Sequence, residues 1–366
     1  MDLRLKILDW YIIKKFMSTF FISMLLIIGL VIIFDVSEKI DDFISLKASL
    51  HDIVFYYYVN FVPYFINMFS PLFIFITVIF FTSRMAANSE IIAILSGGVS
   101  YHRMMVPYLL TATFIALLSL VLNLYVVPRA NKTRLQFEAA YVKSYNSSNS
   151  YKRNDIHYQI APGNFVYVKS FSSWNNTAYQ VTVETLDGNK LVSKLTAESA
   201  AWDSATSSWK MRNYVLREYS RGMSDRVTIG PALDTALALT VSDFYRNNKT
   251  VQTLTSPELA KLIKVQKMRG DGSIIYAQIE QHNRLVLPFS TIILTIMGVA
   301  LSSRKRRGGI GWSLVAGIAL TFSYILFLRF SQMFVFTGSL SPGVALWLPN
   351  VLYVFITAFL YKLAPK

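Results

Sequence analysis

The residues best suited to chemistry are scattered along this chain and form no catalytic motif. Its four histidines lie far apart and lack HExxH spacing: His51, His102, His157 and His282. The sequence contains no cysteine, no GxxxxGKS or GxxxxGKT phosphate-binding loop and no GxSxG nucleophile elbow. We therefore expect neither an enzyme nor a nucleotide-binding protein, and no metal or cofactor in this chain.

Charged residues in apolar surroundings are the second kind of candidate. Arg329 follows the apolar run Ile325–Leu328, and an intramembrane charge marks a functional site unless it snorkels to the interface. Glu280 and Arg284 are four residues apart, so they either stabilise a helix or belong to a site. Glu90 lies near the predicted start of a short helix, where it interacts with the helix dipole or contacts a partner. These alternatives remain open.

The elements that must position these residues are mostly membrane helices. Of 366 residues, 53% are hydrophobic and only 16% are charged, whereas soluble domains have about 25% charged residues. Six apolar runs are near the length of about 18–20 residues that crosses a bilayer. They are Phe16–Phe34, Ile53–Phe81 (spanning from Phe61), Met105–Val127, Arg284–Ser302, Ile310–Phe330 and Val344–Leu360. A purely soluble protein and a disordered chain are excluded.

Lysine and arginine in the short connections determine the predicted orientation. One side of the membrane collects the basic N-terminal flank, Arg84, Arg103 and the Arg304–Arg307 cluster, whereas the first loop on the other side has only Lys39 and Lys47. The positive-inside rule then places both termini in the cytoplasm. The net charge of +15 favours anionic lipid or another polyanion as a neighbour.

The middle of the chain is predicted to be a β domain. Tyr179, Val181 and Val183 alternate with polar residues, which is the period of a strand, and Asp187-Gly188 is a hairpin signal. We predict a membrane α+β fold: three transmembrane helices in residues 1–127, a β sandwich or jelly roll on the far side of the membrane in 128–273, and three more helices in 274–366.

Four stretches resemble segments of the LptF/LptG permease family. They are Leu8-Asp9-Trp10-Tyr11-Ile12 (LDRYI in the family), Ser89-Glu90-Ile91 with Gly98 and Ser100 (the coupling segment), Asn164-Phe165-Val166-Tyr167-Val168 (NFVYI) and Trp347-Leu348-Pro349-Asn350 (the last span). Their order, with three helices on each side of a β domain, is similar to that family, and the first and last motifs resemble LptG more than LptF. Trp10 replaces the usual arginine.

This resemblance implies export of lipopolysaccharide from the bacterial inner membrane by an ABC transporter. The implied partners are an LptF-like permease, an LptB-like ATPase dimer that uses ATP, an LptC-like single-span protein and an LptA-like periplasmic bridge. The β domain would be a periplasmic jelly roll that passes the lipid to this bridge. No nucleic acid is implied.

The resemblance also implies roles for residues of the helical part. In a cytoplasmic coupling helix at about 84–100, the residues implied to contact the ATPase groove are Glu90, Ile91, Ile92 and Leu95. The family's basic gate residue near the outer end of the first span is missing here. Arg329 is expected to replace it, with Lys39 and Arg284 as further candidates.

Five residues of the β domain are expected to point inward. They are Phe165, Tyr167, Tyr179, Val181 and Val183. They form either an ordinary core or, if that core is partly open, the lining of a conduit for acyl chains.

Other transport functions share much of this organisation. A mechanotransmission-type ABC membrane subunit or a lipoprotein-release permease also needs a coupling helix and an outer domain, but conducts no lipopolysaccharide and needs no gate charge such as Arg329. A secondary transporter should show inverted repeats and polar groups at the midplane, and spans one, three and six have few. The sequence therefore favours the lipopolysaccharide permease.

Overall fold

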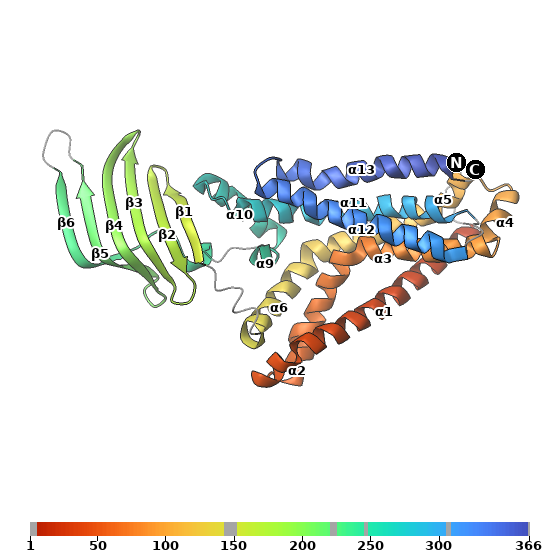
Figure 1. Ribbon diagram of the computed structural model, residues 1–366, viewed down its shortest axis with the longest axis horizontal. Helices are drawn as coiled ribbons and strands as arrows, with labels where there is room; N and C mark the ends of the chain where they lie inside the picture. The colour runs from red at the N-terminus through yellow and green to blue at the C-terminus, as the bar shows by residue number, and fades with distance from the viewer. Residues whose placement is uncertain (1–5, 143–151, 220–224, 245–247, 305–308, 365–366) are drawn as a thin grey trace. The chain divides into compact units, whose positions relative to one another are not determined.

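The computed structural model describes residues 6–142, 152–219, 225–244, 248–304 and 309–364. The chain forms two compact units (Figure 1): a helical unit of residues up to Phe137 and from Gln278 onward, and a β unit of Glu138–Ala277. The β unit is thus an insertion between two groups of helices. Lys305–Arg307, most of the predicted basic cluster, lie outside the described residues.

The described part of the helical unit has six helices long and apolar enough to cross a membrane, as predicted. Its elements are α1 (Ile7–Ser45), α2 (Leu50–Asp52), the π-helical η1 (Ile53–Tyr58), α3 (Val59–Ala87), α4 (Glu90–Ser96), α5 (Tyr101–Val121), the π-helical η2 (Leu122–Val126), α6 (Val127–Tyr141), α11 (Ile274–Ser302), α12 (Gly309–Phe336) and α13 (Pro342–Leu363). Figure 1 shows α4 at the same end of this unit as both chain termini. We call this the terminal end, and the opposite end the insertion end.

Several helices are longer than the apolar runs that predicted them. α1 continues to Ser45, so Asp41 and Asp42 are helical. Phe43 anchors this extension by packing on Tyr57 and Phe137. α5, η2 and α6 form one continuous helix to Tyr141, past the expected start of the β domain at residue 128. The wider π turn of η2 precedes Pro128 and gives the proline ring more room beside the earlier carbonyl than an α turn does.

The coupling segment differs from the single helix predicted at about residues 84–100. α3 continues to Ala87, a turn follows, and α4 has only seven residues. Polar character alone could not locate this break, because α3 remains buried through Met85 and Ala86.

The β unit contains one antiparallel sheet in which each strand pairs with the next in sequence. Its strands are β1 (Lys152–Ala161), β2 (Asn164–Ser172), β3 (Thr177–Asp187), β4 (Lys190–Asp203), β5 (Ser208–Glu218) and β6 (Arg226–Thr235), followed by α8 (Val241–Phe244), α9 (Asn248–Val251) and α10 (Ser256–Arg269). The prediction of a β domain is confirmed. The second sheet of a sandwich or jelly roll is not found among the described residues.

The apolar core of the β unit lies on one face of this sheet. Phe244 of α8 stacks on Phe171 with ring centroids 4.4 Å apart and meets Trp209 edge-on. The buried Trp209 indole donates a hydrogen bond to the Leu239 carbonyl at 2.8 Å. The segment after β6 therefore covers part of the core face.

Three residues with positive φ form a line across the sheet. Asp155, Gln180 and Asn213 have φ of 53°, 48° and 49° on β1, β3 and β5. The strand pairing on either side places Asp155 and Gln180 opposite Lys169 of β2. It places Gln180 and Asn213 opposite Glu198 of β4. This conformation interrupts the alternation of side chains. On β3, for example, Ala178 is buried before the line and Val181, three residues later, is buried after it.

The five residues predicted to point inward lie on both faces of the sheet. Val181 and Val183 belong to the core face, where they pair with Val168 and Val166. The prediction is wrong for three aromatic residues: Phe165, Tyr167 and Tyr179. Phe165 and Tyr179 are 40% and 39% exposed. In β2 the valines face the core, and in β3 the positive φ of Gln180 shifts the alternation at Tyr179.

Gly163, in the turn between β1 and β2, gives a test of this sheet. Its φ is +78°, and a Cβ would lie 2.5 Å from the Leu186 carbonyl oxygen. We expect Gly163→Ala to reduce the stability of β2 and β3 by about 2–3 kcal/mol, measured by hydrogen exchange of their amides in the full chain. Gly188→Ala is the matched control, since Gly188 has φ +62° but open space around it. Equal losses in both variants would contradict the role of the close carbonyl.

Candidate functional site

The short helix α4 is held between two sharply defined turns. Ser89 precedes it with φ of 63°, and Gly98 follows it with φ of 87°. Ser100 then caps α5, because its Oγ accepts a hydrogen bond from the Arg103 amide at 3.3 Å. The motif that resembles the family's coupling segment therefore consists largely of the residues at which α4 begins and ends.

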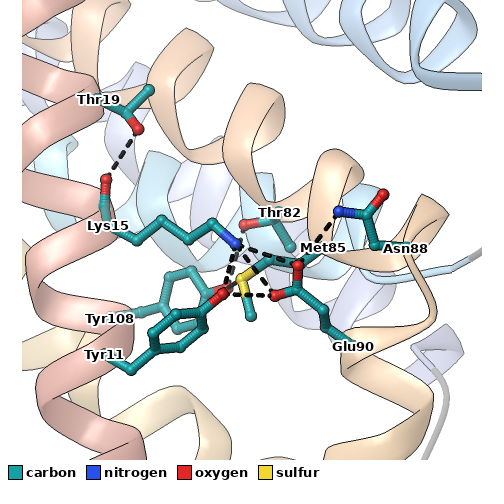
Figure 2. Close-up of polar contacts among 8 residues, drawn as sticks. All are labelled: Tyr11, Lys15, Thr19, Thr82, Met85, Asn88, Glu90 and Tyr108. Carbon is teal, nitrogen blue, oxygen red and sulfur yellow. Dashed lines mark hydrogen bonds and ion pairs between the residues drawn. The ribbon is translucent and has the colours of Figure 1, made fainter.

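The carboxylate of Glu90, the first residue of α4, is held mainly by α1 (Figure 2). Lys15 Nζ lies 3.0 and 3.3 Å from its two oxygens, and the Tyr11 hydroxyl donates to Oε2 at 2.9 Å. Asn88 Nδ2 donates to Oε1 at 3.3 Å. Tyr11 and Lys15 are one turn apart on α1, and Lys15 Nζ also donates to the Tyr11 hydroxyl at 2.8 Å.

The contacts of Glu90 keep its carboxyl ionised. Partial burial raises its pKa, but hydrogen bonds from Lys15, Tyr11 and Asn88, and the charge of Lys15, outweigh burial and place the pKa below the ordinary value of 4.5. A lowered folded-state pKa means that these contacts stabilise fully above the ordinary value and are lost as pH falls through the lowered one. The acid is therefore charged throughout the physiological range.

An apolar cluster lies directly beneath this ionic group. Tyr108 is fully buried and stacks on Phe81, and Figure 2 shows its hydroxyl beside Thr82 and Met85. The Tyr108–Thr82 hydrogen bond measures 3.2 Å. The charged contacts are thus backed by dry, closely packed side chains, which limits their freedom to rearrange.

The three apolar residues predicted to enter a partner groove have different surroundings. Ile91 is 1% exposed and belongs to the chain's own core, so in this structure it offers no surface to a partner. Leu95 is half-buried against the same core. Ile92 is 52% exposed and is the apolar residue of α4 best placed for contact. Burial of Ile91 follows from the break at Ser89, which turns α4 back onto α1 and α3.

A second ion pair joins α1 to the start of α5. Asp9 accepts hydrogen bonds from both terminal nitrogens of Arg103, at 2.8 and 2.5 Å. The Asp9 side chain is only 4% exposed. This bidentate geometry is the strongest form of an arginine–carboxylate contact.

Two of the three predicted gate residues have carboxylate partners. Lys39 pairs with Asp35 at 2.5 Å and donates to the Tyr57 hydroxyl. The buried Arg284 pairs with Glu280 at 3.0 Å.

Arg329 is exposed near the insertion end of α12, and its guanidinium reaches Gln332 Oε1 at 3.4 Å. Among the described residues it has no carboxylate partner. Of the three predicted gate residues it is therefore the one available to an anion.

An apolar groove of about 690 Å³ lies between α1 and the α2–η1 segment. Ile32, Val36, Ile40, Lys47 and Val54 are among the residues that line it. Within the described ranges, no three histidine, aspartate or glutamate side chains gather closely enough to hold a metal ion. Arg329 can therefore bind an anion and the groove can bind an apolar chain, but the described residues show no catalytic arrangement.

Comparison with known protein families decides the relationship. Residues 10–363 match the family described as lipopolysaccharide export system permease LptF/LptG. The chain belongs to this family. A search among curated proteins finds no match.

As an LptF/LptG permease, the chain contains functional candidates that its sequence alone did not reveal. Tyr11 and Asp9 lie in the first family-like motif, but nothing there indicates that they reach α4 and α5. Lys15 contributed only to the basic flank. One available signal was Asp9, an acid within that basic flank, which is unusual at the start of a span and suggests a specific partner.

Proposed function

We propose that this chain is an LptG-like subunit of an ABC transporter that extracts lipopolysaccharide from the bacterial inner membrane. In this proposal it pairs with an LptF-like permease and an LptC-like single-span protein. An LptB-like ATPase dimer hydrolyses ATP, and the β unit passes the lipid to an LptA-like bridge. The whole-chain family match and the six long apolar helices support the proposal.

The distribution of charge supports an orientation with both termini in the cytoplasm and the β unit in the periplasm. The terminal end carries basic side chains on α1, α3 and α5, including Lys14, Arg84 and Arg103. Basic residues near short loops favour the cytoplasmic side. This orientation places α4, with Glu90 and Ile92, where a cytoplasmic ATPase would bind.

The strongest support for a lipid path is the core face of the sheet, because part of this face is apolar but only partly covered. Ile160, Val183, Tyr214 and Leu216 pack against the core but remain only half-buried. Leu216 pairs with Leu195, which pairs with Val183, so these side chains form a row across three strands. Such a row suits the acyl chains of a lipid in transit.

A photocrosslinking amino acid at Leu216 tests the proposed lipid path in the assembled transporter. We expect ATP-dependent crosslinks to lipopolysaccharide at this position. The same amino acid at Phe165, exposed on the opposite face, is the control and should give at least about tenfold less crosslinked lipid, since it lacks the continuous apolar row. Equal or absent crosslinking at both positions would favour a mechanotransmission subunit that conducts no lipid.

A further inference from the structure

One feature of the molecule has no function assigned so far: α1 is attached to the chain both where α4 begins and just after it ends. Three side chains hold the Glu90 carboxylate, and two of them, Tyr11 and Lys15, come from α1. Lys15 and Glu90 are about three-quarters buried, with side chains 25% and 27% exposed. Because water screens this pair only in part, it is stronger than an ordinary surface ion pair.

Apolar packing reinforces the same attachment. Ile91 of α4 shares a buried cluster with Ile12 and Phe16 of α1. Phe16 also contacts Phe81 of α3, with ring centroids 5.3 Å apart. The face of α1 that carries Ile12 and Phe16 lies next to Tyr11 and Lys15, so one short stretch of α1 holds α4 through both charge and burial.

The Asp9–Arg103 pair completes the attachment on the other side of α4. Arg103 lies in the first turn of α5, seven residues after α4 ends. The entry to α4 and its exit are therefore both fixed to the first three turns of α1. A displacement of α4 relative to α1 would have to break a bidentate ion pair, a second ion pair and a buried contact.

α1 itself is well suited to transmit such a displacement. It runs without proline from Ile7 to Ser45, whereas α3 contains Pro63 and Pro71. Its apolar middle is largely free of protein contacts, since only 11% of its most apolar window is buried. At the insertion end it is fixed again to η1, because Asp35 accepts a hydrogen bond from Tyr58 at 3.1 Å and Lys39 donates one to the Tyr57 hydroxyl.

We propose that Tyr11 and Lys15 are positioning residues that fix the coupling acid Glu90 to α1, so that α1 moves together with α4. This inference rests on the proposed coupling of α4 to an ATPase. It assigns transmission between ATP hydrolysis and lipid release to the first helix. In this proposal the Glu90 carboxylate has two kinds of partner: side chains of α1 hold it within the chain, and a basic surface of the ATPase binds it from outside.

The first test compares three variants of α1 in the assembled transporter. Lys15→Met should retain ATPase association and ATP hydrolysis within about twofold but release about five- to tenfold less lipopolysaccharide per ATP, the effect of losing one partly screened charged contact. Lys15→Arg should restore export, because it keeps the charge. Lys14→Met is the matched control, since Lys14 is the exposed neighbour and has no contact with Glu90.

Each outcome of this comparison decides between defined alternatives. Parental lipid release per ATP in Lys15→Met overturns the inference, as does loss of ATPase association together with thermal stability. If Glu90→Ala itself leaves ATPase association and export unchanged, the proposed coupling function has failed. If Glu90→Ala impairs both and Lys15→Met impairs neither, only the role of α1 has failed.

The second test measures joint movement directly and uses the absence of native cysteine. Spin labels at Lys14 and Ser96, both exposed, report the distance between α1 and α4. This distance should stay constant between nucleotide-free and vanadate-trapped transporter, while that between Ser96 and Lys362 of α13 changes. A change in the first distance, or constancy of both, overturns the inference.

Discussion

The Glu90→Ala variant is expected to insert normally but to lose most ATPase association and more than about tenfold of export, as for removal of a charged contact at an interface. The substitution removes the acid that α4 presents at the terminal end of the helical unit. It also leaves Lys15 and Tyr11 without their shared acceptor. Co-purification of the ATPase and transport in proteoliposomes measure the two losses.

Two further variants separate the causes of that loss. Glu90→Gln keeps an acceptor for Tyr11 but removes the charge, so it should resemble alanine in ATPase association. Glu38→Ala is the matched control, because Glu38 is an exposed acid far along α1. Parental association and export in Glu90→Ala would remove α4 from the coupling site.

Replacement of Arg329 by alanine is expected to reduce lipopolysaccharide crosslinking and export by about tenfold, which corresponds to losing one charged hydrogen bond of roughly 1.5 kcal/mol. Among the predicted gate residues, Lys39 and Arg284 are already paired with acids, whereas Arg329 reaches only Gln332. A guanidinium binds phosphate bidentately and stays charged, so Arg329→Lys should retain only part of the activity.

Two controls for the Arg329 variants compare residues at other places in the helical unit. Arg129→Ala removes another exposed arginine, on α6, and should export at the parental rate. ATPase association should be unchanged in the Arg329 variants, since Arg329 lies in the half of α12 nearer the insertion end and Glu90 at the terminal end. A folded Arg329→Ala protein with parental export would show that this residue only anchors the helix at the interface.

Hydrophobic patterning was sufficient to predict the helical architecture of this chain. Runs such as Phe16–Phe34 and Met105–Val127 are long enough to cross a bilayer, and the structure contains a helix at each. The ends of those helices were less predictable. Asp35 and Lys39 look like loop residues in sequence, but as an i,i+4 pair they stabilise one more turn of α1.

The candidate site was predictable only in part, because its decisive contacts join distant segments. Glu90 was found from its motif, but its partners Lys15 and Tyr11 precede it by 75 and 79 residues. Ile91 has the spacing of an exposed amphipathic face and is instead buried, since the turn at Ser89 changes the direction of the chain. Sequence periodicity contains neither kind of information.

The line of positive-φ residues across the sheet also determines how the β unit can change in length. Gln180 and Asn213 each shift the alternation of their strand, since Ala178 and Val181 face the core on β3, and Met211 and Tyr214 do so on β5. Adding one residue within β3, on either side of Gln180, would therefore turn part of that strand inside out, whereas added residues in a hairpin loop would disturb neither half. Insertions in this protein should be tolerated at the turns and excluded wherever they alter the count of residues between a turn and this line.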